Sequence, residues 1–185
     1  MRIYINPGHD REYDPGAINP CTGLQECDVA WEIGCRLQNY LQQAGIETKF
    51  RQTDNLDGDT EHPDRPVSVV GEANDWEADL FVSIHCNAFN TEAQGTEVEC
   101  YSFGSEGARL AQCIQDEIVG SLGTIDRGIK ERPGLAVLKG TDMPSVLVET
   151  AFIDNNEDAF LLSTKQDEFA RAIARGITDY IQQTV

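Results

Sequence analysis

The amino-acid sequence predicts a three-layer α/β domain, with a twisted, mostly parallel six-stranded sheet flanked by five or six helices. Short apolar runs of strand length alternate along the chain with longer segments whose apolar residues recur at helical spacing. Three of the runs, at 3–5, 80–84 and 145–148, show little polar alternation, which is typical of parallel strands buried on both faces. A chain of 185 residues is also expected to form one domain, residues 1–185.

Six strands are expected, and turn-forming residues bound most of them. They comprise residues 2–6, 46–52, 80–85, 96–101, 135–138 and 145–149. Polar and apolar residues alternate in the 96–101 segment, so we expect that strand to be half exposed or at a sheet edge. A turn containing Gly140 and Pro144 separates the short apolar segment 135–138 from the last strand.

The expected helices lie between these strands, with apolar residues at intervals of three or four. They comprise residues 26–44, 66–76, 105–120, 157–162 and 164–181. Gly45 ends the first helix, and Pro66 suits the first position of the second. Asn155 or Asn156 is expected to cap the fourth, and Thr164 opens a sequence that resembles a capping box for the last.

Charge and composition exclude several classes of function. The formal net charge is -18, and no Lys/Arg cluster of the kind that binds phosphate backbones is present, which argues against nucleic acid as a ligand. No apolar stretch approaches the roughly 20 residues that a membrane span needs. The chain begins almost directly with a strand, so we expect no signal peptide; either the protein is made in the cytoplasm or a preceding segment has been removed.

The six cysteines do not form a recognisable framework. They lack CxxC pairs, so a cysteine-only zinc site is not expected. An even number permits disulfides, but a chain of this size does not need them. Cys35 and Cys113 fall on predicted helix faces, where free buried cysteine is the ordinary outcome.

Polar side chains follow three of the predicted strands at the point where each strand ends. His9, His85 and Glu149 each come after an apolar run. Ligands of open α/β sheets bind outside the carboxyl ends of the strands, so these side chains would share one rim if their strands are neighbours. Glu26 lies in the first turn of a helix, on its apolar face, and is expected to point over the same rim. His62 lies in an acidic loop and is expected to be a solvated surface histidine.

Two histidines and one carboxylate are a known set of catalytic zinc ligands, with water at the fourth position. The candidate ligands are His9, Glu26 and His85, and Glu149 is placed to take the proton of the water during metal-assisted amide hydrolysis. Spacing alone leaves an alternative open, because no HExxH motif is present and each histidine could be a hydrogen-bonded structural residue. A carboxylate directly after Val-Leu-Val, however, is costly to bury unless it is paired or linked to a metal.

Several motifs together carry a resemblance to a known family. They are INPGH at 5–9, DPGA at 14–17, Glu26, FVSIHCNA at 81–88, RGIK at 127–130, LAVL at 135–138 and MPSVLVETAFI at 143–153. With these motifs the chain resembles, nearly end to end, the zinc-dependent N-acetylmuramoyl-L-alanine amidases of type 3, a family of autolysins and phage endolysins.

The resemblance implies a zinc ion held by His9, Glu26 and His85, with zinc-bound water attacking and Glu149 acting as general acid/base. It implies a bacteriolytic peptidoglycan hydrolase that cleaves the amide between the lactyl group of N-acetylmuramic acid and L-alanine of the stem peptide. Such an enzyme acts at the bacterial cell wall, in an extracellular or periplasmic location. We also expect a monomer.

Three further residues are expected to contact the substrate. Asn87 lies two residues beyond His85 and could bond the peptide backbone. Arg127 and Lys130 belong to the main basic cluster and could meet stem-peptide carboxylates. The alternative for each of the three is a solvated loop residue or a structural ion pair.

The sequence departs from the family pattern at two positions, and neither is a proposed ligand. Asp10 stands where the family often has glycine, and Cys86 replaces a small apolar residue. No long insertion follows the 96–101 strand, where some members have a helix that blocks the zinc, so we expect an open site.

Three other functions fit parts of the sequence. A cysteine peptidase is disfavoured because His85 and Cys86 are adjacent on a strand and would point to opposite faces. A non-catalytic wall-binding module of the same fold is disfavoured because all four residues of the predicted zinc site are intact. A zinc carboxypeptidase is chemically close and stays open.

Overall fold

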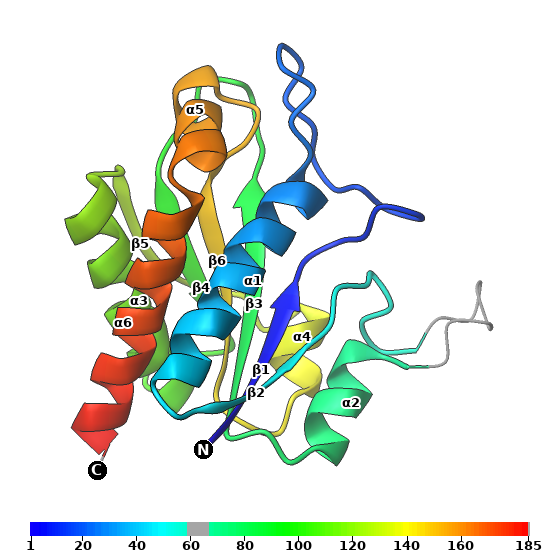
Figure 1. The fold of residues 1–185 in the computed structure, drawn as a ribbon, viewed down its shortest axis with the longest axis vertical. Helices are drawn as coiled ribbons and strands as arrows, with labels where there is room; N and C mark the ends of the chain where they lie inside the picture. Colours follow the sequence, from blue (N-terminus) through cyan, green and yellow to red (C-terminus); the bar gives the residue numbers. More distant parts are fainter. Residues whose placement is uncertain (59–66, 185) are drawn as a thin grey trace.

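The computed structural model describes residues 1–58 and 67–184 and contains a six-stranded sheet with the strand order β2-β1-β3-β6-β4-β5 (Figure 1). The strands are β1 (Arg2–Pro7), β2 (Glu47–Phe50), β3 (Leu80–Asn87), β4 (Thr96–Cys100), β5 (Asp126–Glu131) and β6 (Ser145–Phe152). The helices are α1 (Glu26–Gln43), α2 (Val69–Asp75), α3 (Glu106–Leu122), α4 (Ala136–Gly140), α5 (Asn156–Thr164) and α6 (Gln166–Thr184). Strands β2, β1, β3 and β6 are parallel, and the β4–β5 pair runs in the opposite direction. The predicted fold class is confirmed.

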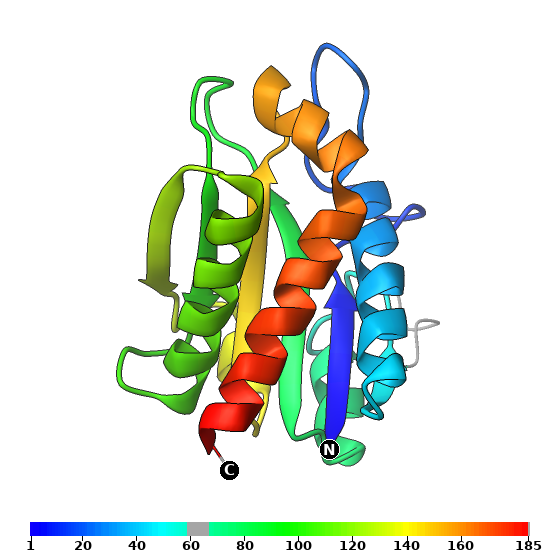
Figure 2. The same cartoon turned by 60° about the vertical axis from the view of Figure 1, so that its left-hand side comes forward.

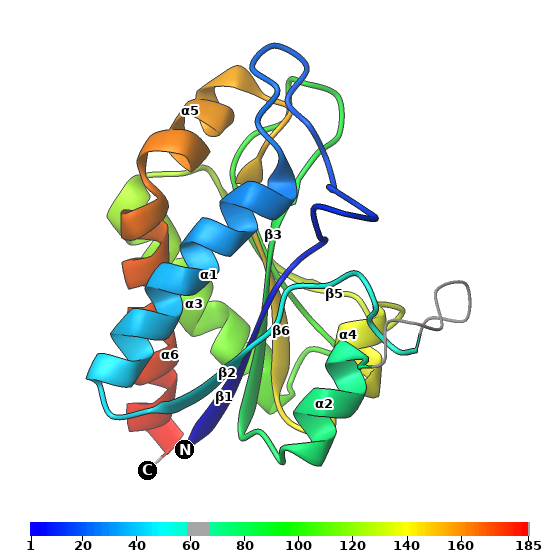
Figure 3. The ribbon, with the colours of Figure 1, turned by 45° about the vertical axis from the view of Figure 1, so that its right-hand side comes forward.

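Helices cover the two faces of the sheet to different extents. Helices α1, α3 and α6 form a full layer on one face (Figure 2), and α2 and α4 lie on the other (Figure 3). Alternate strand residues point to opposite faces, so Ile5 and Val82 enter the first core, whereas Tyr4, Phe81 and Leu147 pack with α2 and α4. Helices α2 and α4 lie over the amino-terminal half of the strands (Figure 3). The described helices therefore leave the carboxyl-terminal half of this face uncovered.

Strand β4 differs from its prediction. It lies between β6 and β5 and not at an edge, and all five of its residues are buried. The polar residues that gave the alternating pattern are Glu97 and Glu99, which pair with Arg127 and Arg132. Ion pairing thus lets the acidic positions of this strand face the protein and not the solvent.

The predicted strand at 135–138 is wrong. This segment leads into the short helix α4, whose Val137 and Leu138 pack against α2. The sixth strand is instead β5, an edge strand in which Ile129 is the sole large apolar side chain. An apolar run of four residues has no periodicity that separates helix from strand, and an exposed edge strand has little apolar signal.

The helix ends follow the predictions in part. The Asn155 side chain accepts hydrogen bonds from the backbone N–H groups of residues 157 and 158 and caps α5 as expected. The capping role predicted for Thr164 is wrong, because this residue ends α5 and its hydroxyl donates to the Phe160 carbonyl. Pro66 and His62 lie outside the described residues.

None of the described helices is both long enough and apolar enough to cross a bilayer.

Candidate metal centre

Three side chains that are far apart in the sequence meet at the carboxyl edge of the sheet. His9 follows β1, His85 lies near the end of β3, and Glu26 begins α1. Each offers one ligand atom, and these atoms all lie within 4.8 Å of one another. The Glu26 Oε1 atom is 3.2 Å from His9 Nε2 and 3.0 Å from His85 Nδ1. The arrangement follows from the topology, because β1 and β3 are parallel neighbours and their ends share one edge.

The loop after β1 approaches these side chains closely. A Cβ atom at Gly8 would lie 2.2 Å from Cε1 of His85, and one at Gly16 would lie 2.6 Å from Oε2 of Glu26. Glycine at both positions therefore leaves room for two of the candidate ligands. His9 has a φ of 61°, in the left-handed region that residues with a Cβ seldom adopt. Such strain is found preferentially at functional sites.

Hydrogen bonds orient the candidate ligands. The Asp14 Oδ2 atom lies 2.8 Å from Nδ1 of His9, which directs the other ring nitrogen toward Glu26. The Glu26 carboxylate accepts from the backbone N–H of Ala17 at 2.9 Å and of Cys86 at 3.0 Å. Partners of this kind fix the orientation of metal ligands. Asp14 belongs to the DPGA motif, but nothing in that motif indicates its role beside His9.

The pKa values of His9 and Glu26 shift in opposite directions. Burial lowers the pKa of His9, but the hydrogen bonds and charges of Glu26 and Asp14 outweigh it and raise the pKa to about 9. Burial raises the pKa of Glu26, but His85 and His9 outweigh it and hold the pKa well below its ordinary value. Glu26 is thus a buried carboxylate that stays ionised, and a bound cation would displace the proton of His9 because a ligating imidazole is neutral.

Glu149 lies beside this group. It is the register partner of His85 across the parallel β3–β6 pair. Its Oε2 atom is buried and has no hydrogen-bond partner within the described ranges. Burial, with added repulsion from Glu26, Glu99 and Glu97, raises the pKa of Glu149 well above its ordinary value. A carboxyl group whose pKa is raised in this way suits general acid/base chemistry.

The buried carboxylate of Glu97 was not among the predicted site residues. This residue is the register partner of Glu149 across the antiparallel β4–β6 pair and is 4% exposed. Its Oε1 atom accepts a hydrogen bond from Asn87 Nδ2 at 3.1 Å, and its Oε2 atom accepts one from Arg127 Nε at 2.8 Å. Glu97 therefore binds both Asn87 and Arg127, which are two of the predicted substrate contacts. The signal for it was present as two acids at alternate positions of one strand.

The basic residues near the site are engaged with the protein. The Arg127 guanidinium lies 4.7 Å from the centroid of the Phe152 ring, in addition to its ion pair with Glu97. The Lys130 Nζ atom donates to the Arg127 carbonyl at 2.6 Å. Arg127 and Lys130 therefore lie next to one another. The ion pair of Arg127 with Glu97 agrees with the alternative given above, a structural ion pair. Their contact with a substrate stays a prediction.

The two departures from the family pattern have structural explanations. Asp10 accepts hydrogen bonds from the backbone N–H groups of Glu12 and Tyr13 and holds the turn after His9. Cys86 points into the core on the face opposite His85. Burial and the charge of Glu26 raise the pKa of the Cys86 thiol well above its ordinary value. A neutral, buried thiol is a poor nucleophile, which argues against a cysteine peptidase.

The donor set fits a zinc ion. Two imidazole nitrogens and one carboxylate oxygen are the ligands of a known class of catalytic zinc site, which leaves one position open. The partnerless Oε2 atom of Glu149 is a polar group that a metal site with bound water would satisfy. Six free cysteines are present, and none belongs to this group.

Comparisons with known proteins identify the family of this chain. A family model described as N-acetylmuramoyl-L-alanine amidase matches residues 3–179. The uncharacterized protein YqiI of Bacillus subtilis is 37% identical over 98% of this chain and 85% of its own length. The germination-specific N-acetylmuramoyl-L-alanine amidase of the same organism is 32% identical over 98% of this chain and 80% of its own length. The B. subtilis amidase LytC is 36% identical over 96% of this chain, which spans 35% of LytC.

Solved structures share the whole fold. The N-acetylmuramoyl-L-alanine amidase of Clostridium difficile 630 superposes with a TM-score of 0.85 and 30% identity, over 100% of this chain and 98% of its own. The amidase AmiC2 of Nostoc punctiforme gives a TM-score of 0.84 and 32% identity, over 98% of this chain and 97% of its own. Sequence and fold agree, and the chain therefore belongs to the N-acetylmuramoyl-L-alanine amidase family of hydrolases.

Proposed function

We propose that this chain is a zinc-dependent peptidoglycan amidase that cleaves the amide between the lactyl group of N-acetylmuramic acid and L-alanine of the stem peptide. One observation carries the proposal: ligand atoms of His9, Glu26 and His85 lie within 4.8 Å of one another, and a buried carboxyl group lies on the adjacent strand. The family supports the choice of bond, since relatives such as LytC are named for this activity.

Each residue of the site has a separate role in the proposed reaction. His9, Glu26 and His85 would hold the metal, and Asp14 keeps the His9 ring in position. When bound, zinc supplies a Lewis acid and lowers the pKa of water to about 7. Glu149 would accept a proton from the attacking water and give it to the departing amine of L-alanine. Burial and the neighbouring carboxylates raise its pKa well above the ordinary value, which favours the protonated form that donates to a leaving amine.

Asn87, Arg127 and Lys130 are the proposed contacts for the stem peptide. Glu97 binds the first two and sets them beside Glu149. The Nη2 atom of Arg127 has no partner within the described part of the chain, so it is available to a stem-peptide carboxylate. The enzyme would act as a monomer at the bacterial cell wall, outside the cytoplasm, in keeping with the cell-wall amidases and endolysin among its relatives.

The decisive experiment is metal analysis of the purified protein followed by mass spectrometry of digested peptidoglycan. We expect bound zinc, loss of hydrolysis with a chelator, and recovery when zinc is returned. The products should be stem peptides with a free L-alanine amino group and glycan with an intact lactyl carboxyl group.

Two outcomes would contradict the proposal. New termini within the stem peptide would identify a carboxypeptidase and not an amidase. Loss of hydrolysis on thiol alkylation, with no effect of the chelator, would identify a cysteine enzyme.

A further inference from the structure

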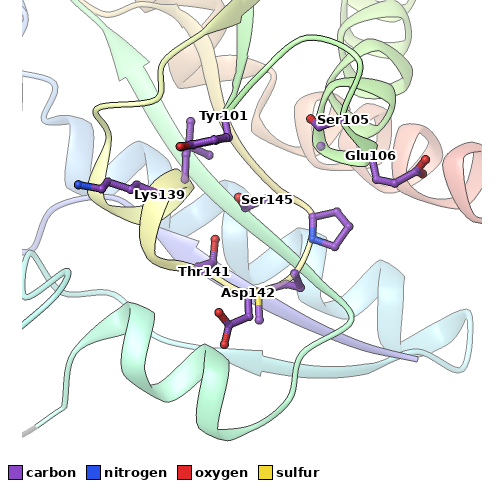
Figure 4. Close-up of a pocket in the computed structure, with 11 residues that line it drawn as sticks. Tyr101, Ser105, Glu106, Lys139, Thr141, Asp142 and Ser145 are labelled. Carbon is purple, nitrogen blue, oxygen red and sulfur yellow. The ribbon is translucent and has the colours of Figure 1, made fainter.

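Strand β6 borders two different regions of the molecule. Its first residue, Ser145, lines the pocket drawn in Figure 4, at the end of the strand that lies away from the candidate metal centre. Toward its other end it carries Glu149 and, directly after it, Thr150, which is 0% exposed. The contacts of the buried Thr150 hydroxyl lead to two of the candidate metal ligands.

The register of β3 and β6 changes at Thr150. The two strands pair residue by residue up to His85 and Glu149. The next pair is Asn87 with Phe152, so β6 contains one residue more than β3 between these pairs, as in a β-bulge. Bulges are common next to active sites, where they re-aim a side chain. Thr150 lies within this irregularity, and its side chain contacts the peptide group that follows His85.

That peptide group connects Thr150 to the candidate ligands. The Thr150 hydroxyl donates to the carbonyl oxygen of His85 at 2.9 Å. The N–H of the same peptide group belongs to Cys86 and donates to the Glu26 Oε1 atom at 3.0 Å. The same Glu26 oxygen lies 3.0 Å from His85 Nδ1 and 3.2 Å from His9 Nε2. A continuous chain of hydrogen bonds therefore runs from Thr150, through the peptide group after His85, to the Glu26 carboxylate.

Thr150 is itself held from several sides. The Cys86 Sγ atom lies 3.4 Å from Thr150 Oγ1, and the thiol is the donor in this contact because the hydroxyl proton points at His85. The Thr150 carbonyl accepts a hydrogen bond from the Thr96 hydroxyl at 2.7 Å. Hydrogen bonds that form such a chain in buried surroundings strengthen one another. These contacts restrict the rotation of Thr150, so its hydroxyl can keep the peptide group in one orientation.

We propose that Thr150 is a positioning residue, which fixes the peptide group after His85 and thereby holds the Glu26 carboxylate and the His85 ring in the geometry that binds a metal ion. Groups that hydrogen-bond metal ligands from outside orient them, and their loss typically lowers metal affinity. The metal part of this inference rests on the proposed function. The bond between the Cys86 N–H and Glu26 can be tested without metal.

The first test compares the zinc affinity of three variants of the full chain with that of the unaltered chain, by competition with a chromophoric chelator. Thr150→Val removes the hydroxyl, keeps the shape of the side chain and should weaken zinc binding about 10- to 100-fold. Thr150→Ser keeps the hydroxyl and should bind zinc nearly as tightly as the unaltered chain. The control Thr124→Val removes another buried hydroxyl, which contacts Thr96 and not the peptide group after His85. It should lose stability but not zinc affinity.

The second test uses metal-free protein. Hydrogen exchange of the Cys86 amide, followed by NMR, reports its bond to Glu26. The exchange rate is expressed relative to that of the Val82 amide of the same strand, which removes any change in stability that both amides share. This ratio should rise about tenfold in Thr150→Val, as expected for the weakening of one hydrogen bond. It should stay the same in Thr150→Ser and Thr124→Val.

Several outcomes would overturn the proposal. Unchanged zinc affinity in Thr150→Val would do so, as would an equal loss in Thr150→Ser or Thr124→Val, because packing or stability would then explain the effect. An unchanged exchange ratio for Cys86 in Thr150→Val would overturn it with or without zinc. If the unaltered chain binds no zinc, the proposed function fails, and the exchange ratio alone then decides whether Thr150 positions Glu26.

Discussion

The Glu149 side chain has two properties that conflict in a folded protein. Its buried Oε2 atom lacks a partner among residues 1–58 and 67–184, which costs stability, and the same burial raises its pKa well above the ordinary value. By contrast, Asp14 is satisfied by its hydrogen bond to His9. Glu97 is satisfied by a hydrogen bond from Asn87 and an ion pair with Arg127. At the scale of single residues, the proposed catalytic group is therefore the destabilising one.

Replacing Glu149 with glutamine should abolish hydrolysis and leave metal binding intact. The amide keeps the size of the side chain but cannot exchange a proton, so the rate should fall about 10²- to 10⁴-fold. Zinc content and peptide release from purified wall measure the two effects. The control Glu92→Gln alters an exposed carboxylate on a neighbouring loop and should have normal activity. Undiminished turnover in Glu149→Gln would remove Glu149 from the mechanism.

The same substitution should change the pH dependence of stability in metal-free protein. The folded-state pKa of Glu149 lies above the unfolded value near 4.3, so the folded state binds more protons and loses stability as pH rises between the two values. The variant lacks this titration. Urea unfolding should therefore give equal free energies near pH 4 and a growing advantage for Glu149→Gln toward pH 8. A difference that does not vary with pH would contradict the assigned pKa shift.

Substitution of Glu97 by glutamine should act mainly through the groups that it positions. Loss of the ion pair frees Arg127 and weakens the bond to Asn87, so KM for a peptide-bearing substrate should rise by about tenfold. The negative charge of Glu97 also contributes to the raised pKa of Glu149, so the acidic limb of the pH–rate profile should move to lower pH. A merely structural residue would reduce stability without moving that limb.

At the scale of elements, the Glu72 carboxylate of α2 links β1 to the residue that follows β2. Glu72 accepts hydrogen bonds from the Tyr4 hydroxyl of β1, at 2.6 Å, and from the Arg51 guanidinium just after β2. The Arg51 hydrogen bonds lower the pKa of Glu72 to about 2, against the opposing effect of burial. The tie keeps α2 in place over the amino-terminal half of the sheet.

Loss of this tie should be visible as a loss of stability that depends on pH. The stabilisation by Glu72 is present above the unfolded-state pKa near 4.3 and is lost as pH falls toward 2. Glu72→Gln should thus cost about 1–2 kcal/mol of unfolding free energy at pH 7 and almost nothing near pH 2. Denaturant unfolding at both pH values measures this. Glu47→Gln, at an exposed carboxylate of β2, should change little at either pH.

The elements also show what the sequence could and could not predict. Apolar runs located β1, β3 and β6, and the shared edge of parallel strands predicted that His9, His85 and Glu149 would meet if these strands are neighbours, which they are. Glu26 was predicted at the same edge from its place on the apolar face of the first turn of α1. Strand β5 was missed because an edge strand needs few apolar residues. The burial of Glu97 was missed because it depends on strand order, which long-range pairing determines and no local pattern encodes.

At the scale of the whole molecule, the surface charge should control access to the wall. The net charge of -18 repels anionic wall polymers, and salt screens that repulsion. Digestion of purified wall should accelerate as ionic strength rises from about 0.01 M to about 0.15 M, where the Debye length falls from about 30 Å to about 8 Å. A small neutral muropeptide should be hydrolysed at a rate that changes little over this range. A flat response with intact wall would contradict the idea.

The uncovered half of the sheet has a consequence for the geometry of attack. Helices α2 and α4 lie over the amino-terminal half of the strands, so no described helix covers this face of the sheet beside the rim that carries His85 and Glu149. A face that no helix covers can contact the side of a cross-linked polymer network, which has few free chain ends. An enzyme of this shape can release a peptide from the middle of a strand and needs no terminus to begin.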